Sequence, residues 1–183
     1  KVGVSRLLAA VGQSLSDNHR IEEALPLLRR AAEADPEYLD AQTQLGICLM
    51  RHGLESEAEA PLRAAFDLDP FNVWVYNLIK LAERDKQYRS FECGRLKVKL
   101  PESDAAIVGP YIREWGEAEL AHSEKLYGFK IERPVRVTWL KAHSDFSARV
   151  TGLPHLDASG ASFGPFVALV SPRAMLASPN PDN

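Results

Sequence analysis

Residues 11–70 read VGQSLSDNHRIEEALPLLRRAAEADPEYLDAQTQLGICLMRHGLESEAEAPLRAAFDLDP, and one pattern in them returns after 34 positions. Glycines, alanines and large apolar residues recur together with a closing dipeptide: Gly12 with Gly46, Leu15 with Leu49, Ala24 with Ala58, Leu28 with Leu62, Ala31 with Ala65, and Asp35-Pro36 with Asp69-Pro70. A period that returns small and large residues together predicts a unit that packs against copies of itself.

This period, with a glycine in the first helix, alanines in the second and a closing Asp-Pro, resembles the tetratricopeptide repeat (TPR). Glycine and alanine let two antiparallel helices approach closely, and leucine fills the space beside them. Pro36 and Pro70 disfavour helix at the residue before them and so end the second helix of each unit. The resemblance implies a helical solenoid over residues 3–87 that binds a protein or peptide.

Apolar periodicity places the helices of this region. We expect them at Val4–Leu15, Ile21–Ala34, Leu39–Arg51, Glu55–Leu68 and Asn72–Arg84. The last helix opens a third unit whose second helix does not follow, so we interpret it as a capping or junction helix. Because such arrays need about three repeats for independent stability, we expect further repeats before Lys1.

The first helix of each unit lines the concave face of a solenoid. Steps of 34 residues place seven candidate peptide-binding side chains there: Arg6, Gln13, Asp40, Thr43, Trp74, Asn77 and Arg84. Their mixed polar and apolar character suits peptide binding. The alternative is that so short an array packs this face on the neighbouring domain.

Composition limits the classes of function. The chain has 183 residues and a net charge of −3, which gives no support for nucleic-acid binding. It has no apolar run of about 18 residues, so we expect no membrane span. Two cysteines do not make a disulfide framework, and Cys48 is predicted to be a buried free thiol. The sequence does not fix the compartment, because a chain that starts at Lys1 without methionine indicates a fragment.

From about residue 88 the pattern changes to short strands mixed with helices. We expect strands at Phe91–Leu100, Pro134–Leu140 and Phe166–Val170, and helices at Ala105–Tyr127 and His143–Val150. Gly128 is placed to cap the long helix, and Ser144 and Asp145 are placed to cap the short one. Ser162–Pro165 is expected to form a hairpin turn.

The predicted fold class is therefore an all-α TPR solenoid over residues 1–87, followed by a small α+β domain over residues 88–176. The α+β domain is expected to hold a mixed sheet with one long helix and to be incomplete. Residues 177–183 are expected to be a flexible tail.

The order of these elements, with ARVTGLP (Ala148–Pro154) and SFGPFVALVSPRA (Ser162–Ala174), resembles the segment before the active site in the peptidase MA-like family. These are gluzincin-type zinc metallopeptidases, often found behind TPR arrays. In that family the hairpin leads into a helix with His-Glu-x-x-His, which binds zinc and activates a water molecule. This chain has no His-Glu pair, so no catalytic residue or metal ligand is assigned. We expect no cofactor and no peptidase activity in this chain, with zinc bound only in a longer parent protein.

The resemblance also implies a role for the hairpin in substrate binding. In zinc peptidases of this type an edge strand pairs with the extended substrate, which places Phe163, Phe166, Val167 and Leu169 near that role. The alternative is that they are core residues of an incomplete domain. If a missing helix normally covers the sheet, these side chains are exposed, and we expect the chain to form a homodimer through them.

Three hypotheses follow. The first is a TPR protein-interaction module attached to the non-catalytic N-terminal part of a zinc metallopeptidase. The second is a purely non-catalytic TPR scaffold with a peptidase-like remnant. The third is a TPR scaffold with an unrelated cap, and it requires that the region after residue 90 lack a mixed sheet backed by the long helix.

Overall fold

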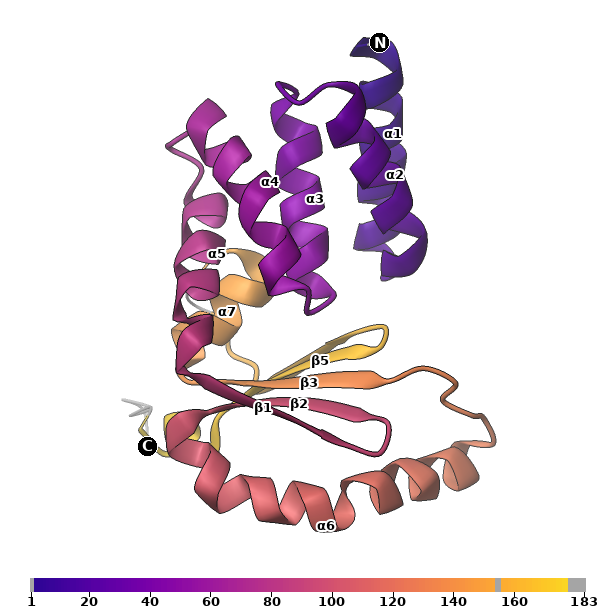
Figure 1. Ribbon diagram of the computed structural model, residues 1–183, viewed down its shortest axis with the longest axis vertical. Coiled ribbons are helices and arrows are strands. Elements are labelled where there is room, and N and C mark those ends of the chain that lie inside the picture. The colour runs from indigo at the N-terminus through magenta and orange to yellow at the C-terminus, as the bar shows by residue number, and fades with distance from the viewer. Residues whose placement is uncertain (1, 154–155, 178–183) are drawn as a thin grey trace.

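The computed structural model describes residues 2–153 and 156–177. It shows a stack of helices standing over one sheet, with a long helix beneath the sheet (Figure 1). The elements in chain order are α1 (Val2–Asp17), α2 (Ile21–Ala34), α3 (Leu39–Arg51), α4 (Glu55–Leu68), α5 (Val73–Glu83), the 3₁₀ helix η1 (Arg84–Gln87), β1 (Tyr88–Cys93), β2 (Leu96–Pro101), α6 (Glu102–Tyr127), β3 (Val135–Leu140), α7 (His143–Thr151), β4 (Gly160–Phe163), β5 (Phe166–Val170) and α8 (Pro172–Ala177). Apart from Ala177, the predicted tail lies outside the described residues.

Helices α1 to α4 form two helical hairpins, and the repeated glycines explain how closely their helices pack. A Cβ atom on Gly46 would lie 2.5 Å from Cδ2 of Leu62, and one on Gly12 would lie 2.7 Å from Cγ of Leu28. Only glycine therefore leaves room for the leucine of the partner helix. The close approach predicted from the 34-residue period is confirmed.

The predicted helix ends agree with the structure at most positions. Helix α6 ends at Tyr127, and Gly128 follows with φ 69° and donates its N–H to the carbonyl of Glu124 at 2.9 Å. The predicted capping of α7 by Ser144 and Asp145 is wrong, because no side chain caps its first turn. The carboxylate of Asp145 instead accepts a hydrogen bond from Arg84.

The sheet has five strands in the order β1-β2-β3-β5-β4. Strands β2, β3 and β5 are parallel, with Val137 opposite Val98 on one side and Val167 on the other. Strands β1 and β4 pair antiparallel at the two edges. The single strand predicted at Phe91–Leu100 is wrong, because Gly94 at φ 55° turns the chain and makes this segment a hairpin.

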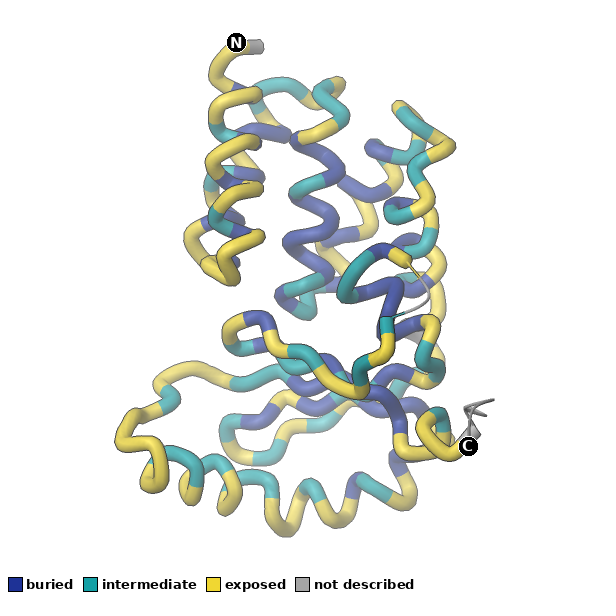
Figure 2. The backbone as a smooth tube through the Cα atoms, turned by 180° about the vertical axis from the view of Figure 1, so that it is seen from behind, coloured by how far each residue is buried: buried dark blue, intermediate teal, exposed yellow. Residues whose placement is uncertain are grey.

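The sheet separates two hydrophobic cores. On the repeat side, Phe166, Ala168 and Val170 join Leu140 and Phe146 in one core with the buried residues of the repeats. On the other side, α6 packs against β1 and β2 over a smaller core. Figure 2 shows the contrast, with buried positions through the middle of the stack and exposed positions along the outer turns of α6.

This architecture bears on two expectations. A mixed sheet backed by the long helix is present, so the condition that the third hypothesis required is not met. Within the described ranges, none of the helices combines the length and the apolar character needed to cross a membrane.

Candidate functional site

The concave-face residues predicted from the repeats fall into two groups. At the α1 end, Arg6, Gln13 and Asp40 are exposed. The Arg6 guanidinium lies 5.9 Å from the centroid of the Tyr38 ring, and the Tyr38 hydroxyl donates a hydrogen bond to Asp40 at 2.9 Å. A cation, an aromatic ring and a carboxylate are thus held side by side and open to solvent.

At the α5 end the chain contacts itself. Asn77 donates through Nδ2 to the carbonyl oxygen of Gly152 at 2.9 Å, and Arg84 pairs with Asp145 at 2.5 Å. Gly152 has φ 78°, and a Cβ atom there would lie 2.2 Å from Cγ of Trp74. Helix α7 and its C-terminal glycine therefore occupy this end. This part of the face packs on the neighbouring domain, which is the alternative given in the sequence analysis.

The remaining predicted residue, Thr43, is buried between these two groups. Its hydroxyl oxygen has no hydrogen-bond partner among the described residues. Thr43 therefore belongs to the packed part of the face rather than to its open end.

The structure places Arg51, which the sequence analysis missed, beside the predicted residue Trp74. The Arg51 guanidinium lies 5.5 Å from the centroid of Trp74 and 5.7 Å from that of Phe163, and it pairs with Asp17 at 3.3 Å. Asp17 and Arg51 are separated by 34 residues, so the repeat period itself carried the signal. Opposite charges one period apart indicate an ion pair between adjacent units.

The hairpin residues do not have the exposure predicted for them. Phe163 is 5% exposed and Phe166 is fully buried, both against the repeats of the same chain. Val167 and Leu169 point to the opposite face and are half-buried beside the α6 core. The predicted exposure of Phe163 and Phe166 is therefore wrong, because the helical stack covers this face of the sheet. The predicted homodimer depended on that exposure.

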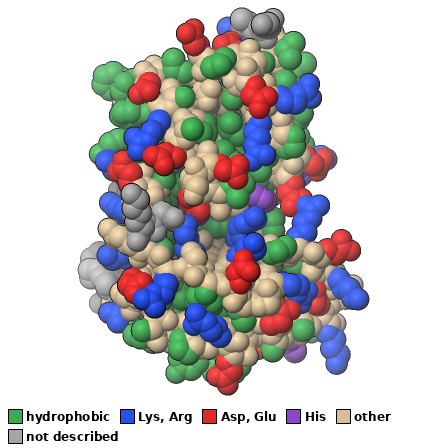
Figure 3. Space-filling model, in the orientation of Figure 1, with side chains coloured by type: hydrophobic (Ala, Val, Ile, Leu, Met, Phe, Trp, Pro, Cys, Tyr) green, Lys and Arg blue, Asp and Glu red, His purple; other side chains and the backbone are tan. Residues whose placement is uncertain are grey.

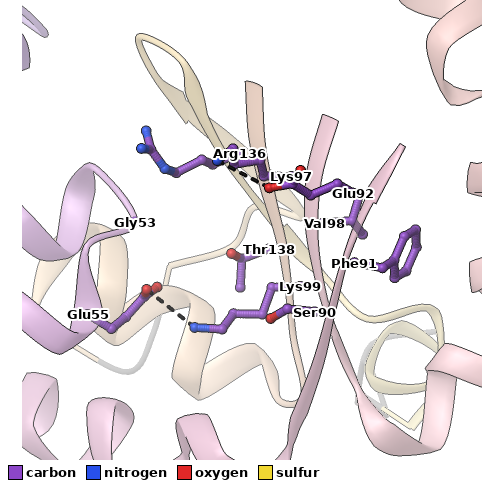
Figure 4. A pocket seen from close by; sticks show the side chains of 10 residues that line it. All are labelled: Gly53, Glu55, Ser90, Phe91, Glu92, Lys97, Val98, Lys99, Arg136 and Thr138. Atoms are coloured by element: carbon purple, nitrogen blue, oxygen red, sulfur yellow. Dashed lines mark hydrogen bonds and ion pairs between the residues drawn. The ribbon is translucent and has the colours of Figure 1, made fainter. Parts of the chain in front are cut away.

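A cavity of about 320 Å³ lies between the α3–α4 turn and the side of β1, β2 and β3 that faces the repeats (Figure 4). Its lining combines charged side chains with hydroxyl groups: Gly53, Glu55, Ser90, Phe91, Glu92, Lys97, Val98, Lys99, Arg136 and Thr138. Gly53 brings the turn onto the sheet, since a Cβ atom on it would lie 2.7 Å from the Phe166 ring.

A buried ion-pair network forms one wall of this cavity. Glu55 accepts a hydrogen bond from the almost fully buried Arg149 and pairs with Lys99 at 3.3 Å. Burial alone would raise the pKa of Glu55, but the positive charges of Arg149 and Lys99 outweigh it and hold that pKa at about 2. The Arg149 guanidinium also lies 5.0 Å from the centroid of the Phe166 ring. The network therefore ties the start of α4 to α7 and to the sheet.

His52 lies beside this cavity and is mostly buried. Burial, followed by the charge of Arg136, lowers the pKa of His52. The imidazole is therefore neutral at neutral pH, and its Nδ1 atom has no hydrogen-bond partner in the described part of the chain.

The described residues do not form a metal or thiol centre. Within the described ranges, no three His, Cys, Asp or Glu side chains come together in a way that could hold a metal ion. The zinc implied by the peptidase resemblance thus finds no fitting ligand set, and we derive no hydrolytic step through it. Cys48 and Cys93 are free, and burial raises the pKa of the Cys48 thiol to about 11.

Comparison with known proteins gave one match. Residues 15–81 match the family model of the tetratricopeptide repeat, which spans most of the helical stack. No curated protein and no solved structure matches the chain. The match supports a protein–protein interaction module in the helical region, and none of the comparisons supports a peptidase domain after it.

Proposed function

Starting from tetratricopeptide repeats over residues 15–81, we propose that the chain is a protein-interaction module that binds a peptide at the α1 end of its concave face. One observation carries the proposal: Arg6, Gln13 and Asp40 are exposed at that end, whereas the α5 end is held by α7. The peptide is therefore expected to contact the first two repeats.

The chemistry of this end suits a peptide with mixed character. Arg6 offers a cation and Asp40 a carboxylate, while the Tyr38 ring between them offers a flat apolar surface. Because Tyr38 contacts both charged groups, their orientation is set before a ligand arrives, which lowers the entropy lost on binding.

The test is a selection of peptides from a random phage-displayed library on the purified chain. We expect enriched peptides to bind with Kd near 1 μM, about −8 kcal/mol, in calorimetric titration. Arg6→Glu should weaken this binding about tenfold or more, because it reverses a charge inside the contact.

The matched control is Arg30→Glu, which reverses the charge of an exposed arginine on α2, outside the concave face. Its affinity should equal that of the unmodified chain. Failure to enrich any peptide, or equal losses in the two variants, would refute peptide binding at the α1 end.

For residues 88–176, we propose a relationship to the peptidase MA-like family, with the β4–β5 hairpin binding extended substrate in a longer parent protein. Two features support this: a mixed sheet backed by α6, and the short antiparallel strand β4 at the sheet edge. A sheet edge offers main-chain groups to an extended peptide. The alternative is a scaffold that keeps a peptidase-like remnant without activity.

Two measurements on the full-length parent separate the two alternatives: its metal content and its degradation of casein. This 183-residue chain is the control. Stoichiometric zinc and chelator-sensitive cleavage in the parent alone would support the peptidase. A parent without zinc would leave the scaffold.

A further inference from the structure

The cavity between the α3–α4 turn and the sheet is a separate site from the α1 end of the concave face. It lies beneath the α3–α4 turn, where the repeats meet β1, β2 and β3 (Figure 1). On the face shown in Figure 3, Lys and Arg side chains are scattered among Asp and Glu side chains, and some of them lie in the middle of the molecule. What this cavity binds is therefore a question beyond the proposed function of the repeats.

The charged side chains of the cavity do not balance. Lys99 pairs with Glu55 at 3.3 Å, and Lys97 pairs with Glu92 at 3.2 Å. Arg136 extends from β3 across Gly53 and has no carboxylate partner among the described residues. Because Glu55 is shared between Lys99 and the buried Arg149, the cations around the cavity outnumber its two carboxylates.

Hydroxyl groups add hydrogen-bond donors to this excess charge. Thr138 is only 5% exposed, and its side chain projects into the cavity between the two ion pairs (Figure 4). Ser90 lines the cavity from β1 and is exposed. Each hydroxyl group can donate a hydrogen bond, so this lining suits a ligand that accepts hydrogen bonds.

We propose that this cavity binds a carboxylate group, with Arg136 as its main charged partner and Thr138 as a hydroxyl donor. A guanidinium matches the two oxygens of a carboxylate with two parallel hydrogen bonds. Glu55 and Glu92 in the lining would repel a doubly charged phosphate more strongly than a singly charged carboxylate. The carboxylate belongs either to the C-terminus of a peptide or to a free small acid.

Titration of the ¹⁵N-labelled chain, followed by NMR, tests this inference with four probes: N-acetylglycine, its uncharged analogue N-acetylglycinamide, acetate and inorganic phosphate. We expect saturable shifts of the Gly53 and Thr138 amides with N-acetylglycine, with Kd in the millimolar range. The amide analogue should give no saturable shift. Tighter binding of N-acetylglycine than of acetate would identify a peptide C-terminus, and the reverse order would identify a free small acid.

Two substitutions locate the site. Arg136→Gln should weaken N-acetylglycine binding about tenfold or more, because it removes a charge-assisted hydrogen bond. Thr138→Val, which keeps the shape of the side chain, should weaken it about threefold or more. Arg133→Gln is the matched control, since Arg133 lies outside the cavity and pairs with Glu22, and it should leave the affinity unchanged.

Three results would overturn the inference: equal binding of the acid and the amide, tighter binding of phosphate than of either carboxylate, or unchanged affinity in Arg136→Gln. The absence of a saturable shift up to the solubility limit of N-acetylglycine would overturn it too. The comparison of acid with amide uses the unmodified chain, so it holds even if a substitution impairs folding.

Discussion

At the α5 end of the concave face Trp74, Asn77 and Arg84 contact α7, whereas at the α1 end Arg6 and Asp40 face solvent. Arg6, Asp40 and Trp74 stand one period apart in the same 34-residue pattern. A repeat therefore specifies which side chains line the face, and the neighbouring structure decides whether they become core or surface. In this chain one face serves both as an internal interface and as the candidate binding surface.

The largest expected effect is the loss of Phe146, which is fully buried where α7 meets the repeats. Phe146→Ala should lower the free energy of unfolding by about 3–5 kcal/mol, because it leaves a cavity between the sheet and the stack. Urea denaturation measures this change. Phe71→Ala is the matched control, since Phe71 is 90% exposed, and it should change stability by less than about 0.5 kcal/mol. Equal losses of stability in the two variants would show that the contact between α7 and the repeats contributes no more than an exposed side chain.

Second in size is the removal of the charge on Glu55, which holds α7 to the start of α4 through Arg149. Glu55→Gln should lower stability by about 3 kcal/mol at pH 7, because it leaves Arg149 buried without its counter-ion. Glu57→Gln, at an exposed site on the same helix, should have little effect. Chemical denaturation of both variants measures the difference.

The ionisation of the Glu55 carboxylate should also make the stability of the protein depend on pH. Because the pKa of Glu55 falls from 4.5 to about 2 on folding, its contribution is fully present above pH 4.5 and is lost as the pH falls towards 2. Thermal unfolding between pH 6 and 2 should therefore show a steeper loss of stability in the unmodified chain than in Glu55→Gln. Parallel curves for the two proteins would contradict the depressed pKa.

Asn77→Ala should have a smaller effect, about 1 kcal/mol, because it removes one partly buried hydrogen bond to the carbonyl of Gly152. Gln13→Ala changes a concave-face residue at the open end and should stay within about 0.5 kcal/mol. Thermal unfolding of the two variants compares the ends of the face directly. A larger loss for Gln13→Ala would show that the α1 end is not a free surface.

The smallest expected effect on stability belongs to Asp40→Ala, because Asp40 is exposed and its only described hydrogen bond comes from Tyr38. Stability should change by less than about 0.5 kcal/mol. The same substitution should weaken the affinity of selected peptides in calorimetric titration. A large loss of stability with unchanged affinity would reverse the assignment of the two ends.

Local patterns predicted the parts of the fold that depend on neighbours in sequence. Gly12, Gly46 and the leucines one helix away specified the helical hairpins, and Gly128 specified the end of α6. The pattern at Phe91–Leu100 misled because the alternation of Leu96 with Val98 hid the turn at Gly94. A glycine inside an alternating run weakens the prediction of a strand, and the φ angle of 55° at Gly94 shows that the chain turns there.

The candidate site was less predictable, because its residues come from distant segments. Glu55 and Arg149 are separated by 94 residues, and nothing local marks them as partners. Likewise, no pattern placed Arg136 and Thr138 opposite the α3–α4 turn. Such side chains meet only when the helical stack settles on the sheet.

By itself the sequence determined the repeating helical hairpins, the order of α6, β3, α7 and β5 after them, and which side chains share each face. These properties follow from short-range sterics and from the periods of helix and strand. The tertiary structure alone decided that α7 occupies the α5 end, that the stack buries Phe163 and Phe166, and that a charged cavity lies at the junction. Burial and charge balance depend on contacts between segments far apart in the chain, and those contacts exist only once the two cores have formed against the sheet.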